Sequence, residues 1–226
     1  MGFVTLAHKV AEAKKPVTGL LLSTIAEGSL VKLNESGSPV EFYVAKHDYE
    51  QDLNGAGRTL LVRKAICQLM AWTTKSGNEY DGSTIDTWQN GTYLAKLDAD
   101  AQSAIATTTF YYSSYNEDYD VVTLAKPVFL LSLWELGKTN SYANKEGSTL
   151  PIASLLIPAV DEKGNDAGQW VRSAADSSTY AMRVASNGTV NRATRTAADS
   201  YGVRPCFTLP ANAVFNEETL EFEGVS

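Results

Sequence analysis

The chain has 226 residues, of which 44% are hydrophobic and 20% charged, a composition typical of a globular domain and unlike the highly charged disordered class. Its formal net charge of -7, with no cluster of basic residues to offset it, repels phosphate backbones, so we expect no nucleic-acid partner. Its apolar runs fall far short of the ~20 residues that a spanning helix needs, so we expect no membrane insertion.

The N-terminal segment differs in pattern from the rest of the chain. Apolar residues and alanines recur there at helical spacing, which predicts a short amphipathic helix that ends near Pro16. The following apolar run, residues 20–22, is shorter than the about 7–15 residues of a secretory signal core, so we expect synthesis in a bacterial cytoplasm without a signal peptide. We interpret residues 1–27 as an attachment arm, or alternatively as an N-terminal cap, and residues 28–226 as one domain.

From Gly28 onward the pattern favours β-strands. Residues 30–33 and 40–44 are apolar or alternate with period two, and they flank a turn-forming stretch at residues 35–39. Residues 59–63 form another apolar run after a glycine-rich loop. Together these segments predict a β-meander.

Helix-start and helix-stop signals dominate the middle of the chain. Ser83 is placed to cap a helix that we expect Gly91 to end, and Asp98 is placed to cap a second helix. Ser132 and Glu135 have the spacing of a capping box, and Gly137 is expected to close that short helix. These helices are therefore predicted to be brief.

Strand signals return on both sides of these helices. Residues 127–131 predict a buried strand, and residues 170–172 and 180–184 predict two more, the last followed by the hairpin turn Asn187-Gly188. Residues 203–209 predict a terminal strand. Strands, short helices and then hairpins follow one another in an α+β order rather than in a repeating βαβ order.

Few residues offer catalytic or metal chemistry. The two histidines, His8 and His47, belong to no recognisable nucleophile set. The two cysteines, Cys67 and Cys206, are too few for a disulfide scaffold and too far apart for a zinc pair, so we interpret them as free, buried thiols. The acidic stretch 161–166 misses the spacing of a calcium loop and reads as a solvated turn. We predict a non-enzymatic protein with no cofactor and no metal.

Arginines and tryptophans beside apolar residues have two interpretations. Arg172 and Arg204 are either a clamp for an acidic ligand or buried side chains that tie loops together, and we favour the structural role. Trp88, Trp134 and Trp170 are interpreted as core anchors.

Two polar, aromatic stretches are candidate binding surfaces. Residues 174–201 mix small polar residues with tyrosine and arginine, as adaptable binding surfaces do, although an ordinary polar hairpin has the same composition. The candidate ligand-binding residues there are Asp176, Tyr180, Arg183, Asn191, Arg192 and Arg195. A second patch consists of tyrosines that suit stacking on sugar rings, or packing on a protein partner or another subunit: Tyr111, Tyr112, Tyr115 and Tyr119.

Several blocks between residues 28 and 210 together resemble one domain family. The blocks are residues 28–33, 42–45, 59–64, 83–93, 128–132, 169–173, 187–190 and 201–205. The family they resemble is an uncharacterised one of Firmicutes and their phages. It is similar to the C-type-lectin-like fold, which also contains formylglycine-generating enzymes and the variable proteins of diversity-generating retroelements. The resemblance implies an α+β fold, with short helices packed on small antiparallel sheets and long irregular loops that display a binding surface.

The same resemblance implies a function. Phage members of the family are similar to tail- or fibre-associated virion proteins. We therefore expect a non-enzymatic virion protein of a bacteriophage, a homo-oligomer among other virion proteins, that recognises a host cell-surface glycan or protein. The alternative is a structural virion component, a decoration or assembly protein whose loops contact neighbouring subunits. An exposed Tyr/Arg/Asn surface would favour recognition, the same surface buried between subunits would favour the structural role, and polar groups converging in a deep pocket would favour an enzyme.

Overall fold

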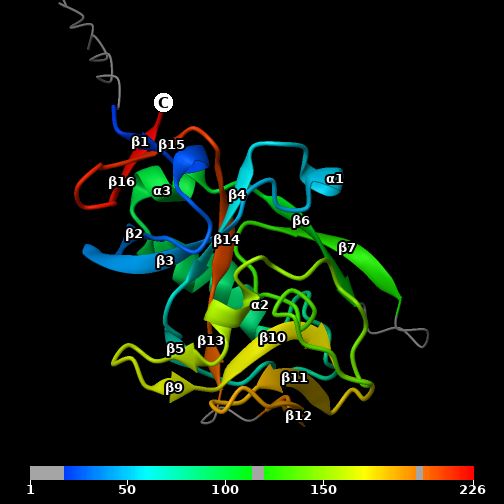
Figure 1. Ribbon diagram of the computed structural model, residues 1–226. Helices are drawn as coiled ribbons and strands as arrows, with labels where there is room; N and C mark the ends of the chain where they lie inside the picture. Colours follow the sequence, from blue (N-terminus) through cyan, green and yellow to red (C-terminus); the bar gives the residue numbers. More distant parts are fainter. Residues whose placement is uncertain (1–17, 114–119, 197–200) are drawn as a thin grey trace, which may run out of the picture.

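Short strands make up most of the structure, because the apolar runs of this sequence are short and are separated by glycine and proline turns. The computed structural model describes residues 18–113, 120–196 and 201–226 (Figure 1). Several small, mostly antiparallel sheets are joined by long loops and a few short helices, which confirms the predicted α+β class. None of the helices in these ranges is long and apolar enough to cross a membrane.

A four-stranded antiparallel sheet runs through the middle of the molecule (Figure 1). Its strands, in spatial order, are β14 (Cys206–Pro210), β4 (Arg58–Arg63), β3 (Ser38–Lys46) and β2 (Leu30–Glu35). The predicted meander of residues 30–63 is thereby confirmed, since β2, β3 and β4 pair consecutively.

A five-stranded sheet lies at the bottom of the molecule in Figure 1. Its order is β12 (Val190–Thr194), β11 (Tyr180–Val184), β10 (Gln169–Ala174), β13 (Gly202–Val203) and β5 (Gln68–Leu69). The predicted turn between β11 and β12 is confirmed, because Gly188 there has a φ of 75°. The two edge strands of this sheet are β12 and β5.

Three smaller sheets complete the fold. They are β1 (Leu20–Leu21), β15 (Ala213–Phe215) and β16 (Phe222–Val225); the ribbon β6 (Thr108–Ser113) and β7 (Val121–Lys126); and the pair β8 (Ala159–Val160) and β9 (Asp166–Ala167). The stretch 203–209 is therefore not one terminal strand. Pro205 divides it between β13 and β14, and two more strands follow.

The helices are α1 (Gln51–Asn54), α2 (Thr84–Trp88) and α3 (Ala99–Ala104), with 3-10 turns at Leu22–Thr24, Leu94–Lys96 and Ala153–Leu156. Ser83 caps α2 as predicted, since its side chain accepts a hydrogen bond from the Asp86 amide. The prediction that Gly91 ends this helix is wrong. The chain continues through a π-helical turn, Gln89–Tyr93, because Tyr93 is fully buried in the core and its hydroxyl donates to Glu35.

The other local signals have mixed outcomes. Asp98 directly precedes α3, but its carboxylate does not cap the helix and instead accepts a hydrogen bond from the side-chain amide of Asn34. Ser132 and Glu135 form the reciprocal hydrogen bonds of a capping box, and Gly137 follows with a φ of 66°, but residues 133–137 form turns rather than the predicted short helix. Residues 128–131 are buried as predicted, yet they form a single bridge to β14 rather than a continuous strand.

Two hydrophobic cores hold the sheets together. The larger one is rich in aromatic side chains and includes Trp72, Phe110, Phe129 and Trp170. The second core contains Leu22 and Ile25, because β1 pairs with β15. Residues 20–25, assigned above to the arm, thus pack on the domain, whereas residues 1–17 with the expected helix lie outside the described ranges. Both cysteines are free thiols, with Cys206 fully buried.

Candidate functional site

A buried network of charged side chains lies beneath one polar pocket. Arg172 on β10 donates two hydrogen bonds to Glu135, with Nη1–Oε2 and Nη2–Oε1 distances of 2.7 and 2.9 Å. The Tyr49 hydroxyl donates to the same carboxylate at 2.5 Å. All three side chains are fully buried, so each depends on the others for the interactions that water would otherwise provide. The favoured structural role of Arg172 is confirmed, and Arg204 likewise donates to two backbone carbonyls.

A second buried carboxyl group completes the network. Glu146 lies with its Oε2 4.0 Å from the Arg172 Nε, and it accepts from the Ser113 amide and the Ser173 hydroxyl. Burial would lower the pKa of Arg172, but Glu135, Tyr49 and Glu146 together outweigh that effect and raise the pKa. Burial raises the pKa of Glu146, against the opposing effect of Arg172.

Glu50 is a third carboxyl group near the guanidinium of Arg172, after Glu135 and Glu146. It is only 5% exposed, and its Oε1 has no hydrogen-bond partner among the described residues. Burial raises the pKa of Glu50 above its ordinary value of 4.5, and the neighbouring Glu135 raises it further. Because Arg172 is already paired with Glu135, Glu50 is left with an unsatisfied oxygen.

The backbone around Glu50 is also unusual. Glu50 and Asp48 have φ values of 43° and 49°, in the left-handed region that non-glycine residues rarely adopt. Opposite them, Gly147 has a φ of 79°, and a Cβ atom there would lie 3.0 Å from the Glu50 Oε1. Glycine thus allows the 145–148 loop to approach the carboxyl group closely.

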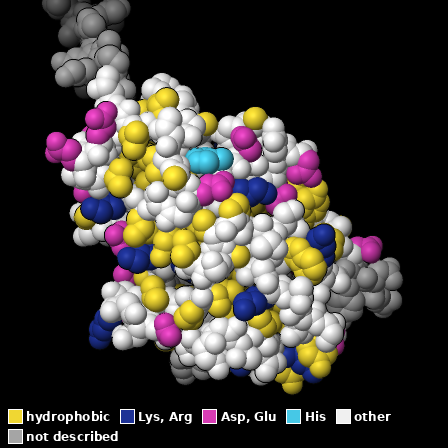
Figure 2. Space-filling view, viewed as in Figure 1, with side chains coloured by type: hydrophobic (Ala, Val, Ile, Leu, Met, Phe, Trp, Pro, Cys, Tyr) yellow, Lys and Arg dark blue, Asp and Glu magenta, His cyan; other side chains and the backbone are white. Residues whose placement is uncertain are grey.

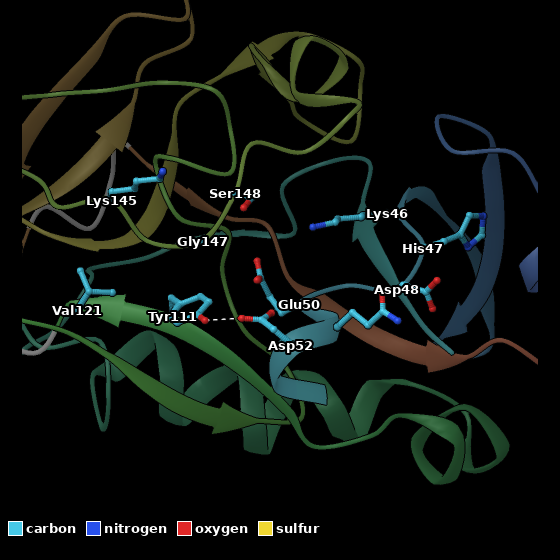
Figure 3. Close-up of a pocket in the computed structure, with 11 residues that line it drawn as sticks. Lys46, His47, Asp48, Glu50, Asp52, Tyr111, Val121, Lys145, Gly147 and Ser148 are labelled. Carbon is cyan, nitrogen blue, oxygen red and sulfur yellow. Dashed lines mark hydrogen bonds between the residues drawn. The ribbon is translucent and has the colours of Figure 1, made fainter. Parts of the chain in front are cut away.

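These residues line an open pocket of about 670 Å³ (Figure 3). Lys46 and Lys145 extend into it from two sides, with the Glu50 carboxyl group between them and Ser148 above it. The Tyr111 hydroxyl donates to Asp52 at 2.5 Å along another wall. The pocket therefore combines donors, acceptors and an aromatic ring.

Two further pocket residues are occupied by structural contacts. Asp48 accepts a hydrogen bond from the Gly57 amide at 2.6 Å. The two ring nitrogens of His47 lie 2.9 Å from the Thr59 hydroxyl and 3.0 Å from the Ile25 carbonyl oxygen. His47 therefore holds loops in place rather than pairing with a nucleophile. Among the described residues, no group of three or more His, Cys, Asp or Glu side chains is arranged to hold a metal ion.

Half of the predicted ligand-binding residues come together on the five-stranded sheet. The Arg192 guanidinium stacks over the rings of Tyr142 and Tyr180, with its carbon 4.2 and 4.9 Å from the ring centroids. Its Nη1 also lies 2.7 Å from the Asp176 Oδ1. We call Asp176, Tyr142, Tyr180 and Arg192 the Arg192 cluster.

The other predicted residues lie elsewhere on that sheet. Arg183 is paired with Asn191 across β11 and β12, so both point to the face opposite Tyr180 and Arg192. Arg183 stacks on the ring of Tyr201, with its guanidinium carbon 4.5 Å from the ring centroid. Arg195 donates to the carbonyl oxygens of Ser178 and Lys75. The six residues therefore do not form one surface.

The predicted tyrosine patch is divided as well. Tyr111 and Tyr112 are neighbours on β6 and point to opposite faces, with Tyr112 buried and Tyr111 lining the pocket. Tyr115 and Tyr119 lie outside the described residues.

The sequence interpretation missed the residues that complete these two sites. Tyr142 stands alone in a loop, and nothing in its neighbourhood indicates that it reaches Arg192. The polar and charged stretch 46–52 begins at the last residue of β3, and it is the one local pattern that could have indicated the pocket. Its partners at residues 145–148 lie far away in sequence, and only the fold brings them together.

A family model described as a domain of unknown function, DUF6273, matches residues 56–211. No curated protein and no solved structure matches the chain. The matched range contains Glu135, Glu146 and Arg172, and it begins just after the segment that carries Glu50.

Proposed function

The chain belongs to the DUF6273 family, and from this membership and the resemblance described above we propose that it is a non-enzymatic, ligand-binding virion protein of a bacteriophage. In this proposal the small sheets, short helices and long loops constitute a C-type-lectin-like fold. The protein works as a homo-oligomer among other virion proteins, in a tail or tail fibre, and recognises a host cell-surface glycan or protein. Fold analogy alone does not determine function, so the proposal depends on the properties of the surface.

The Arg192 cluster is the observation that carries the proposal. The side chains of Arg192 and Asp176 are 32% and 44% exposed, and Tyr142 is 39% exposed. Two rings and a carboxylate nevertheless hold the guanidinium in one position. A pre-oriented arginine loses little conformational freedom when it binds, and tyrosine and arginine are enriched among residues that dominate binding energies.

The position of the cluster supports the same function. Arg192 lies on β12, an edge strand of the five-stranded sheet, where a ligand can approach without crossing another strand. On the face shown in Figure 2, acidic and basic side chains are intermingled, with no broad field of one sign. Specific contacts at the cluster therefore offer a better basis for recognition than general electrostatic attraction does.

A structural role in the virion is the second candidate, and the ribbon of β6 and β7 favours it. Val121 and Val122 on β7 are exposed, as are Leu69 and Leu155 elsewhere. Exposed apolar side chains on a projecting ribbon suit contact with a neighbouring subunit. In that case the protein would be a decoration or assembly component rather than a receptor binder.

Binding to cells distinguishes the two candidates. The full chain is incubated with intact Gram-positive cells and with their extracted wall glycans, beside an Arg192→Ala variant. Asn191→Ala is the matched control, since Asn191 is the adjacent residue of β12 and points to the opposite face. We expect Arg192→Ala to weaken binding at least about tenfold, as removal of a central interface arginine does, and Asn191→Ala to leave it unchanged. Absence of binding by the wild type, with the protein enclosed in particles, would instead support the structural role.

A further inference from the structure

We propose that the pocket between the 46–52 segment and the 145–148 loop is a second binding site, which takes one sugar unit of a saccharide and binds one of its hydroxyl groups at Glu50. This inference does not rest on the Arg192 cluster, because none of the residues of that cluster lines the pocket.

The first argument is the unsatisfied oxygen of Glu50. Buried polar atoms in folded proteins nearly always have a hydrogen-bond partner, and the exceptions call for an explanation such as a ligand. The Glu50 Oε1 has none among the described residues, although the side chain is 95% buried and lies at the pocket wall. The left-handed backbone of Glu50 is a second, independent sign, since strained residues concentrate at binding and active sites.

The second argument concerns the chemical group that fits this oxygen. An ionised carboxylate only accepts hydrogen bonds, whereas a protonated carboxyl group also donates one. A hydroxyl group can both donate and accept, so it satisfies Glu50 in either protonation state. An ammonium or a phosphate group would match one state only.

The third argument is the composition of the walls. Lys46 and Lys145 balance the charges of Asp48 and Asp52, which are themselves hydrogen-bonded to Gly57 and Tyr111. With Glu50 included, two ammonium groups face three carboxyl groups, so the pocket does not select an anion. Both ammonium groups and Ser148 can donate to the oxygens of a neutral polyol.

The walls also offer an apolar side and sufficient space. Tyr111 and Val121 line the pocket together, and an aromatic ring beside an aliphatic group suits the C–H face of a sugar ring. The volume of about 670 Å³ falls within the range of about 300–1,000 Å³ that is typical of small-molecule sites. Hydroxyl groups, an apolar face and this size together describe a saccharide.

The site is close enough to the Arg192 cluster to act beside it. Tyr142 of the cluster and Lys145 of the pocket are three residues apart, a span of at most about 10 Å of extended chain. A glycan that contacts the cluster could therefore place a further unit in the pocket.

Titration of the full-length protein with monosaccharides tests this site. The probes are glucose, galactose, rhamnose and N-acetylglucosamine at millimolar concentration, with inorganic phosphate and trimethylammonium as charged comparisons, followed by amide NMR signals. We expect at least one sugar to shift the signals of Gly147 and Ser148 and to leave that of Asn191 in place. Absence of a shift with every sugar, or a shift with phosphate or trimethylammonium alone, overturns the proposal.

Variants separate the pocket from the fold and from the cluster. Glu50→Leu removes the hydrogen-bonding group, and we expect it to fold, since a buried and incompletely satisfied carboxyl group is lost, and to weaken sugar binding at least about tenfold. Lys145 is an exposed residue of the pocket wall, so Lys145→Ala provides a second test if Glu50→Leu does not fold. The Gly147 and Ser148 signals report on the pocket alone, so failure of the pocket proposal remains distinct from failure of the cluster. Asn191→Ala, at a residue that belongs to neither site, should leave these sugar-induced shifts unchanged. Equal sugar binding by wild type, Glu50→Leu and Lys145→Ala would contradict the pocket assignment.

Discussion

Arg172 and Glu135 form a two-pronged ion pair in a place where neither side chain is exposed to solvent. The pair joins strand β10 to the 132–137 turn, and Glu146 and Glu50 crowd around it. It therefore fixes the elements on which the pocket is built.

Loss of Arg172 should strongly destabilise the protein. Arg172→Leu leaves the buried carboxylates of Glu135 and Glu146 without their cation, and breaking a buried pair in this way costs about 3–5 kcal/mol. The free energy of unfolding is measured in urea. Arg192→Ala, which removes a partly exposed pair with Asp176 and two ring contacts, is the control and should cost about 1–2 kcal/mol, less than Arg172→Leu. Equal losses for the two variants would contradict the structural role of Arg172.

Glu50 should make the protein less stable as the pH rises. Its pKa in the folded state lies above 4.5, so the folded protein retains a proton that the unfolded chain has released. The contribution of Glu50 is therefore fully present below about pH 4.5 and is lost as the pH rises through the folded-state pKa. Glu50→Gln removes this dependence, so its stability relative to wild type should increase as the pH rises from 4 to 7.

An aspartate supplies a control of opposite sign. Hydrogen bonds from Asn165 lower the pKa of the exposed Asp161. Its contribution to stability is present above the ordinary pKa and is lost as the pH falls below it. The stability of Asp161→Asn relative to wild type should therefore increase as the pH falls through this range, opposite in sign to the change for Glu50→Gln. A difference between wild type and Glu50→Gln that is constant with pH would show that Glu50 titrates normally.

Gly147 should tolerate substitution less well than a comparable glycine. Gly147→Ala introduces a Cβ atom 3.0 Å from the Glu50 Oε1 and 3.3 Å from the Glu135 Oε1, at a φ of 79°. Gly164 has a φ of 82°, but nothing lies within 4 Å of its Cβ position. Both variants incur about 1–2 kcal/mol from the left-handed backbone, and only Gly147→Ala adds crowding. Urea unfolding should rank Gly147→Ala as the less stable variant, and the reverse order would contradict the close approach of loop and carboxyl group.

The two thiols should be unreactive in the folded protein. Burial raises the pKa of Cys67 to about 12, and it also raises the pKa of the fully buried Cys206. Since the thiolate is the reactive form, alkylation at pH 8 should be slow until denaturant is added. Rapid modification of either cysteine in the native protein would indicate that its surroundings are open.

Short-range signals in the sequence predicted local structure well. The hairpin at Asn187-Gly188, the cap at Ser83 and the capping box at Ser132 depend on residues within a few positions of one another. Gly91 was misjudged because tertiary burial of Tyr93 extends the helix beyond it. The packing of residues 20–25 on the domain depends on a similarly distant contact, since their partner β15 lies near the other end of the chain.

The candidate sites were harder to predict. A two-residue turn at Asn187-Gly188 would pair residue 183 with residue 192 and place both arginines on one face. The observed pairing of Arg183 with Asn191 is shifted by one residue, so the division of the two arginines between opposite faces was not accessible from the sequence. The pocket was not accessible either, because it joins residues 46–52 to residues 145–148, and no local pattern reports such a contact. A buried glutamate also has no compositional signature, since glutamate is nearly always exposed.

Hydrogen exchange of the full chain, with and without extracted cell-wall glycan, tests the proposed recognition most directly. Binding through the Arg192 cluster should slow amide exchange in β12 and around Tyr142, and Arg192→Ala should abolish that protection. Protection that is absent with every glycan, or that is confined to Val121 and Val122 in assembled particles, would contradict recognition through the cluster and favour a structural role.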